Sequence, residues 1–140
     1  GTDKHGTVHT LVTTAANEAD ISQLPGLLHG EEKELLGDQA YWSEFHRQCA
    51  QEAGVRYRVN RRGNHSHPLT DWQKSINRTR SKVRARGEHA FHVVKRLWGF
   101  SKVRYRGLAK NTVQLFTAFA LANLYLLRRR LLPPGERCLL

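Results

Sequence analysis

The stretch "ELLGDQAYWSEFHRQCAQEAGVRYRVN" (Glu34–Asn60) places an amphipathic segment between two apolar runs. The first run is brief and ends at Asp38. The last run, "VRYRVN", alternates apolar residues with arginines, which is the period of a half-buried strand. Between the runs, Ser43 is a candidate N-cap and Gly54 a candidate helix stop. A strand, a helix and a strand in this order predict an α/β fold.

The segments on either side extend this alternation. Upstream, Thr7–Asn17 is rich in β-branched residues and predicts a further strand after the turn "DKHG", and residues 18–30 predict a short helix. Downstream, the loop "RRGNHSHP" leads into a helical pattern over Asp71–Trp98. A second long helix is predicted over residues 111–132, where "PPG" at 133–135 would stop it.

The most apolar stretch, Val113–Leu127, is too short to span a membrane. It is about 15 residues long and includes Gln114, Thr117 and Asn123, whereas a spanning helix needs about 20 predominantly apolar residues. We therefore expect no membrane segment, and a helix buried against the sheet.

Charge divides the chain into three parts. The formal net charge is +11, which indicates a polyanionic partner, most simply a nucleic acid. Residues 1–53 hold 3 Lys or Arg against 9 Asp or Glu, a balance of −6. Residues 54–108 hold 15 against 2, a balance of +13, and residues 109–140 hold 5 against 1, a balance of +4. This pattern suggests carboxylates for a metal and cations for phosphates.

Glu88 is the only acidic residue between Trp72 and Gly135. At about 100° per residue, Glu88 shares one narrow stripe of the predicted helix with Ser81, Arg84 and Lys95. The opposite, core-forming face is predicted to hold Val83, Gly87, Ala90, Val94, Leu97 and Trp98. An ordinary Arg84–Glu88 helix pair, worth about 0.2–0.5 kcal/mol, is the simpler reading; a carboxylate aimed into a cleft is the functional one.

The spacing Arg84, Glu88 and Lys95 resembles the signature of bacterial insertion-sequence transposases with an Asp-Asp-Glu triad. In that signature a Tyr comes first and two residues separate it from the Arg; here the Tyr position is Ser81, a departure. "VHTLVTTAANEADISQ", "GDQAYW" and "VRARGEHAFHVVKRLWGF" are similar to the insertion-sequence family five group, which is related to family four. The likeness is collinear from about Thr7 to Leu132.

This resemblance implies a ribonuclease-H-like catalytic core with long C-terminal helices. Residues 1–140 would form the C-terminal portion of a single such domain, truncated at the N-terminus so that the first strands are missing. Asp38 and Glu88 would be catalytic residues and would bind two Mg²⁺ or Mn²⁺ ions through hard oxygen ligands. Arg84 and Lys95 would contact phosphates of transposon-end DNA. The basic residues that we also predict to bind DNA are Arg80, Arg86 and Arg96.

The first catalytic Asp of the triad has no counterpart in this chain by that resemblance. Asp3 lies in the turn before Thr7–Asn17, where a solvated role is expected. We therefore expect weak or absent metal binding and little cleavage by this chain alone. The implied partners are double-stranded DNA of transposon ends and target, and a homodimer or a full-length transposase, in the cytoplasm at the nucleoid.

Three alternatives remain open from the residues. The first is a non-catalytic DNA-binding remnant that regulates transposition through the same basic helix. The second is a structural metal-binding protein that uses His65, His67, His89 and His92, although no closed four-ligand spacing supports it. The third is a product without a selected role. The two cysteines, Cys49 and Cys138, have no paired spacing, which favours a reducing compartment.

Overall fold

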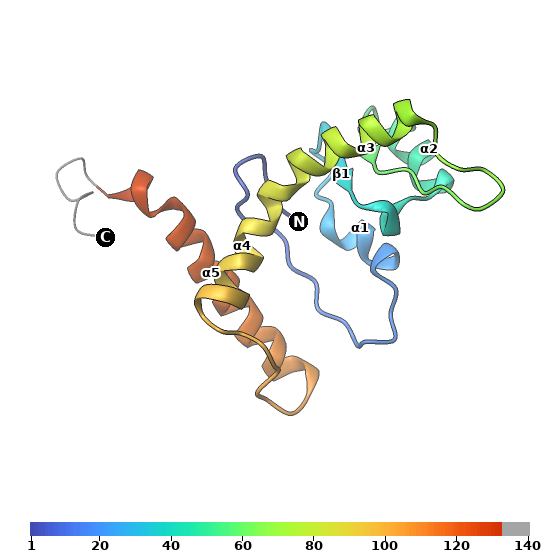
Figure 1. Ribbon diagram of the computed structural model, residues 1–140. Helices are drawn as coiled ribbons and strands as arrows, with labels where there is room; N and C mark the ends of the chain where they lie inside the picture. Colours follow the sequence, from blue (N-terminus) through green and yellow to red (C-terminus); the bar gives the residue numbers. More distant parts are fainter. Residues whose placement is uncertain (133–140) are drawn as a thin grey trace. The chain divides into compact units, whose positions relative to one another are not determined.

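A computed structural model describes residues 1–132 of the chain (Figure 1). Contacts within the chain define two compact units. We call residues 14–86 the middle unit, and residues 1–13 together with 87–140 the terminal unit. The predicted "PPG" stop and Cys138 lie outside the described residues.

The middle unit contains the predicted strand, helix and strand. Strands β1 (Glu34–Gly37) and β2 (Arg56–Val59) pair in parallel, with Glu34 opposite Arg56 and Gly37 opposite Val59. Helix α2 (Glu44–Glu52) connects them, as parallel neighbours require a crossover. The alternation in β2 is confirmed, because Val59 is buried and its arginines are exposed.

The ends of α2 follow the signals in the sequence. The Ser43 hydroxyl accepts a hydrogen bond from the backbone N–H of His46, which satisfies one open donor of the first turn. Gly54 adopts φ +71°, a left-handed conformation that a glycine reaches without the clash of a Cβ. The predicted short helix upstream is also present, as η1 (Asp20–Gln23) followed by α1 (Leu24–Leu27).

Helix α3 (Asp71–Arg84) begins with a capping box. The Thr70 side chain accepts from the Gln73 N–H, and the Gln73 side chain accepts from the Thr70 N–H. At its other end, α3 contacts the carboxyl end of β2. The Arg80 guanidinium donates to the Val59 carbonyl at 2.8 Å, so the last turns of α3 are fastened at this edge of the sheet.

The helical segment that follows α3 is not one regular α-helix, contrary to prediction. A 3₁₀ turn, η3 (Ala85–Gly87), leads to α4 (Glu88–His92), and a π-helical turn, η4 (Val93–Leu97), follows. A 3₁₀ turn advances more than 100° per residue and a π turn advances less. The stripe derived from a constant period therefore does not hold beyond Arg84.

Burial around η4 shows the consequence. Ala90 and Val94 are buried as predicted, and Val93 is buried although the predicted core face does not include it. The predicted core residues that are exposed instead are Val83, Leu97 and Trp98.

The core of the terminal unit forms where α4 and η4 pack against α5 (Leu108–Leu131) (Figure 1). Its buried residues are Ala90, Val93, Val94, Phe119 and Ala122. The prediction of a largely buried second helix is wrong, because α5 buries only Phe119 and Ala122 and exposes side chains such as Val113 and Leu124. No helix among the described residues is long and apolar enough to cross a membrane.

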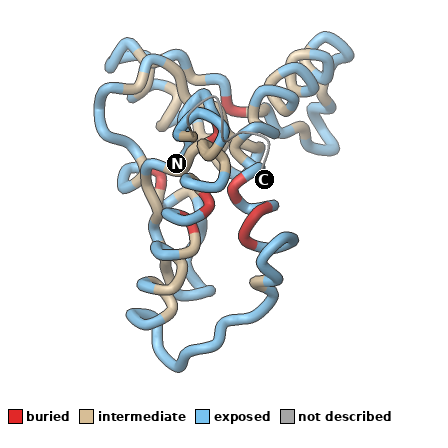
Figure 2. The backbone as a smooth tube through the Cα atoms, turned by 90° about the vertical axis from the view of Figure 1, so that its left-hand side faces the viewer, coloured by how far each residue is buried: buried red, intermediate tan, exposed pale blue. Residues whose placement is uncertain are grey.

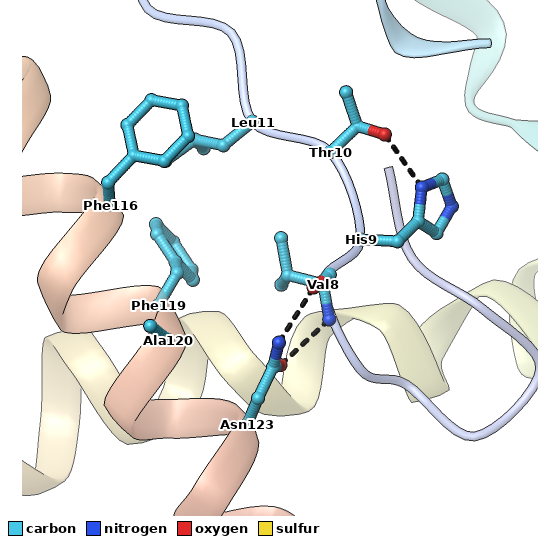
Figure 3. Close-up of a pocket in the computed structure, with 8 residues that line it drawn as sticks. All are labelled: Val8, His9, Thr10, Leu11, Phe116, Phe119, Ala120 and Asn123. Atoms are coloured by element: carbon cyan, nitrogen blue, oxygen red, sulfur yellow. Dashed lines mark hydrogen bonds between the residues drawn. The ribbon is translucent and has the colours of Figure 1, made fainter. Parts of the chain in front are cut away.

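The predicted strand over Thr7–Asn17 is also absent. Val8 makes only an isolated antiparallel bridge with Thr2, because no described strand pairs with this segment. A side chain replaces the missing partner: Asn123 of α5 donates to the Val8 carbonyl at 2.7 Å and accepts from the Val8 N–H at 2.8 Å (Figure 3). Leu11, Phe116 and their neighbours line a partly polar, open pocket of about 130 Å³ beside this contact.

Deep burial is sparse in both units, as the short red stretches of Figure 2 show. Among the described residues, seven apolar side chains are buried and no polar or charged residue is. In the middle unit the buried residues are Leu24 and Val59. Because so few apolar side chains are buried, hydrogen bonds from side chains to the backbone help to hold the segments of each unit in place.

Candidate functional site

Asp38 lies at the carboxyl edge of the parallel sheet. It directly follows β1 and caps η2 (Gln39–Tyr41), because its Oδ1 accepts from the Ala40 N–H at 2.9 Å. The Asn60 N–H donates to the Gly37 carbonyl at 3.1 Å, so Asp38 and Asn60 leave neighbouring strands at the same edge. In open α/β sheets, ligands bind outside the carboxyl ends of the strands.

A second carboxylate lies in the same neighbourhood. Burial raises the pKa of Tyr41, and the carboxylates of Asp20 and Asp38 raise it further, because nearby negative charges disfavour the phenolate. Asp20 begins η1, which packs against η2. Asp20 lies within the stretch "VHTLVTTAANEADISQ", to which the resemblance assigns no site residue. The packing of these two short turns brings it near Tyr41.

Asn60 presents an unusual oxygen at this edge. Its Nδ2 donates to the Ser81 hydroxyl at 2.9 Å, while its Oδ1 is buried and accepts no hydrogen bond within the described structure. A buried carbonyl oxygen without a partner costs about 1–3 kcal/mol. Ser81, the position of the departure from the transposase signature, thus binds the residue that follows β2.

Glu88 begins α4 and is exposed. Gly87, directly before it, lies against the N-terminal segment: a Cβ added to Gly87 would stand 2.6 Å from the Thr2 hydroxyl oxygen. Glycine therefore permits this segment to approach the helix next to the predicted catalytic carboxylate.

The two predicted catalytic carboxylates belong to different units, Asp38 to the middle unit and Glu88 to the terminal unit. Their pairing stays a prediction. The donor chemistry suits Mg²⁺, since carboxylate and amide oxygens such as those of Asp38 and Asn60 are hard ligands. Across residues 1–132, however, no three His, Cys, Asp or Glu side chains gather to hold a metal, so the histidine-based alternative also gains no support.

Three arginines gather beside this edge of the sheet. Burial lowers the pKa of Arg80, and the guanidiniums of Arg58 and Arg61 lower it further, because like charges disfavour the protonated form. Arg58 forms an ion pair with Glu34 at 2.5 Å. Glu34 pairs with Arg58, and no ion pair is found for Arg61 or Arg80 among the described residues, which leaves positive charge for an anionic ligand.

The other predicted phosphate contacts divide between the units. In the middle unit, Arg84 is half-buried at the end of α3 and Arg86 is exposed in η3. In the terminal unit, Lys95 and Arg96 are exposed in η4, and the Lys95 ammonium stands 5.7 Å from the centre of the Phe91 ring. Exposure suits contact with phosphates, and DNA binding by these residues stays a prediction.

The arginine run Arg128–Arg130 has an identified structural role. The Arg128 guanidinium donates to the Tyr125 carbonyl and lies over the Tyr125 ring, 3.9 Å from its centre. A cation at the C-terminus of α5 also complements the helix dipole.

Comparison with known proteins gives one family. Residues 1–124 match the family model described as transposase DDE domain. No solved structure matches the chain.

Proposed function

The chain belongs to the transposase DDE domain family, and we propose that residues 1–140 are the C-terminal portion of the catalytic domain of a bacterial insertion-sequence transposase of the family five group. The family has a ribonuclease-H-like fold, acts on DNA and generally uses divalent metal ions. The match over residues 1–124 is the observation on which the transposase part of the proposal rests. The parallel β1–β2 pair, with Asp38 at its carboxyl edge, supports it.

We assign Asp38 and Glu88 to the second and third carboxylates of the triad. Both supply the hard oxygen ligands that Mg²⁺ or Mn²⁺ prefers. A divalent ion held by them would stabilise charge on the oxygens of a phosphodiester under attack. The position of Asp38 directly after a parallel strand supports its assignment.

The proposed DNA contacts are phosphate contacts. Residues 54–108 hold 15 Lys or Arg against 2 Asp or Glu, which suits the backbone of a double-stranded transposon end. The residues assigned to these contacts are Arg80, Arg84, Arg86, Lys95 and Arg96. A homodimer, or a full-length transposase, at the nucleoid in the cytoplasm belongs to the same proposal.

We do not expect these residues to cut DNA alone, because Asp3 is a poor substitute for the first carboxylate. Its Oδ1 accepts from the N–H groups of His5 and Thr7, both at 2.9 Å. Burial would raise the pKa of Asp3, but the hydrogen bonds from Thr7 and His5 outweigh it and lower this pKa. Asp3 is thus committed to the turn.

The test combines binding with cleavage. The purified chain is mixed with a duplex that carries the transposon end, at about 10 mM Mg²⁺ or Mn²⁺, a range suited to weak sites. We expect a bound complex without nicking. Clear nicking would refute the assigned inactivity, and absence of binding would refute the DNA-binding role.

A second candidate is a non-catalytic regulator that occupies transposon ends, favoured by the neighbouring arginines Arg58, Arg61 and Arg80. Glu88→Ala separates the two functions when full-length transposase is supplied in trans. The substitution abolishes the chain's contribution to strand transfer if the chain completes an active site. It leaves binding unchanged or tighter if the chain only occupies DNA. Glu52→Ala, at the exposed end of α2, is the matched control for loss of one negative charge.

A further inference from the structure

A groove opens in the middle unit between Trp42 and the first turn of α3. It has a volume of about 350 Å³, within the usual size of small-ligand sites. Its lining residues come from the end of η2, the loop after β2 and the start of α3: Trp42, Arg61, Arg62, His67, Pro68, Leu69, Thr70 and Gln73.

The loop that forms one wall is held in place by specific contacts. Asn77 of α3 accepts from the Arg61 N–H at 3.1 Å and donates to the Arg61 carbonyl at 2.9 Å. The Asn64 side chain accepts from the His67 N–H at 2.6 Å, and the Asn64 N–H donates to the His67 carbonyl. Because these bonds close the loop on itself and on α3, the wall of the groove is built before any ligand arrives.

Trp42 and Arg61 present flat groups to the groove. The Arg61 guanidinium lies 5.7 Å from the centre of the Trp42 ring. The Tyr57 ring supports Trp42 from behind the lining, tilted at 50° with 5.8 Å between the ring centres, and the Tyr57 hydroxyl donates to the Tyr41 carbonyl of η2. Aromatic rings and the planar arginine head are the surfaces on which nucleobases stack.

The charge of the groove is positive. Its lining residues include Arg61 and Arg62 and no carboxylate. Beside the groove, burial lowers the pKa of Arg80, and the charges of Arg58 and Arg61 lower it further, so positive charge continues past the lining residues. Hydrogen bonds from Arg47 lower the pKa of Glu44, and the nearby charge of Arg61 lowers it further. Glu44 is therefore paired with Arg47 and does not line the groove. An occupant with a flat apolar face and flanking negative charge is complementary to this arrangement.

We propose that this groove binds an unpaired nucleobase of single-stranded DNA on Trp42 and Arg61, with a neighbouring phosphate on Arg62. The inference rests on the proposed DNA-binding function and deepens it. A base inside a duplex is covered on both faces by its neighbours and does not reach such a groove. The groove therefore favours DNA in which a duplex continues into a single strand over fully paired DNA.

The experiment compares the affinity of the complete chain for three versions of one duplex: blunt-ended, with a three-nucleotide single-stranded extension, and with the same extension made abasic. Stacking of a base is worth roughly five- to hundredfold in affinity. We expect the natural extension to bind tighter than the blunt duplex by a factor in this range. The abasic extension, which keeps every phosphate, should lose most of that gain.

Variants of the chain locate the effect. Trp42→Ala should remove the preference for the natural extension and leave affinity for the blunt duplex within about twofold, since phosphate contacts alone bind the blunt end. Trp72→Ala is the matched control, because Trp72 is 70% exposed in α3 and does not line the groove. It should keep the preference.

The outcomes separate this inference from the proposed function. Equal affinity for all three DNAs overturns the groove assignment while duplex binding stands. Equal binding of the natural and abasic extensions shows that only phosphates are read and also overturns it. Failure to bind any of the DNAs overturns the groove and the proposed function together. The abasic comparison uses the unaltered chain, so it decides the matter even if Trp42→Ala unfolds.

Discussion

At the scale of single residues, polar side chains hold backbone that has no strand partner. Asn123 is the clearest case, because its one amide satisfies both the N–H and the carbonyl of Val8 in a part-buried position. Asn77 does the same for Arg61 across the loop after β2. With so few buried apolar side chains in the described structure, each such bond matters more than in a deep core.

Asn123→Ala should therefore lower the free energy of unfolding by about 1–3 kcal/mol, because both backbone groups of Val8 lose their partner in a region of restricted water access. Urea unfolding monitored by circular dichroism gives this value. Leu124→Ala, at a side chain 57% exposed on the next position of α5, should change stability by about 0.5 kcal/mol or less. Equal effects of the two substitutions would show that the amide is not supporting the segment.

At the scale of elements, the type of helical turn decides which side chains are buried between η3 and η4. A pattern read at the constant period of an α-helix does not. The change from η3 through α4 to the π turn of η4 buries Val93 and exposes Leu97. π turns are frequent at functional sites, and this one carries Lys95 and Arg96, two of the proposed DNA contacts. By contrast α3, with its capping box, is regular over Asp71–Arg84.

Thr70→Ala should destabilise the start of α3, with a cost of about 0.5–2 kcal/mol, since the Gln73 N–H loses its acceptor. Thermal unfolding and the helical circular dichroism signal measure the effect. Thr79→Ala is the control: Thr79 lies inside α3 and its hydroxyl donates to the Ser75 carbonyl. Because alanine is the better helix former, this change should be neutral or slightly stabilising. A loss of stability as large as that of Thr70→Ala would contradict the capping argument.

At the scale of the whole molecule, charge governs the encounter with DNA. The chain carries +11 overall, and phosphate contacts release counterions from the duplex. The logarithm of the association constant should fall linearly with the logarithm of salt concentration, by about 0.9 for each phosphate neutralised.

Arg86→Ala should reduce the size of this slope by about one, because it removes one exposed cation that we assign to a phosphate contact. Binding titrations from low to moderate salt, with duplex DNA of fixed length, measure the change. Arg47→Ala removes the same charge but from an exposed ion pair with Glu44, so its slope should match the unaltered chain. Identical slopes for both variants would mean that Arg86 does not contact the DNA backbone.

The sequence by itself determined the local features of this protein. The β1–α2–β2 order, the Ser43 cap, the alternation in β2 and the place of Asp38 after a strand all follow from residues near one another in the chain. These features are predictable because hydrogen bonds within a helix, and side-chain alternation along a strand, depend on short sequence separations.

Only the tertiary structure decided the rest. Thr7–Asn17 has the composition of a strand but no hydrogen-bonding neighbour, so it binds Asn123 instead. Asp20 lies near Tyr41, and Arg61 lies near Trp42, only because segments distant in sequence pack together. A strand needs a pairing neighbour, a buried face needs a second packed element, and a groove needs an opposite wall. Each of these lies far away in the sequence, so the pattern of one segment does not contain it.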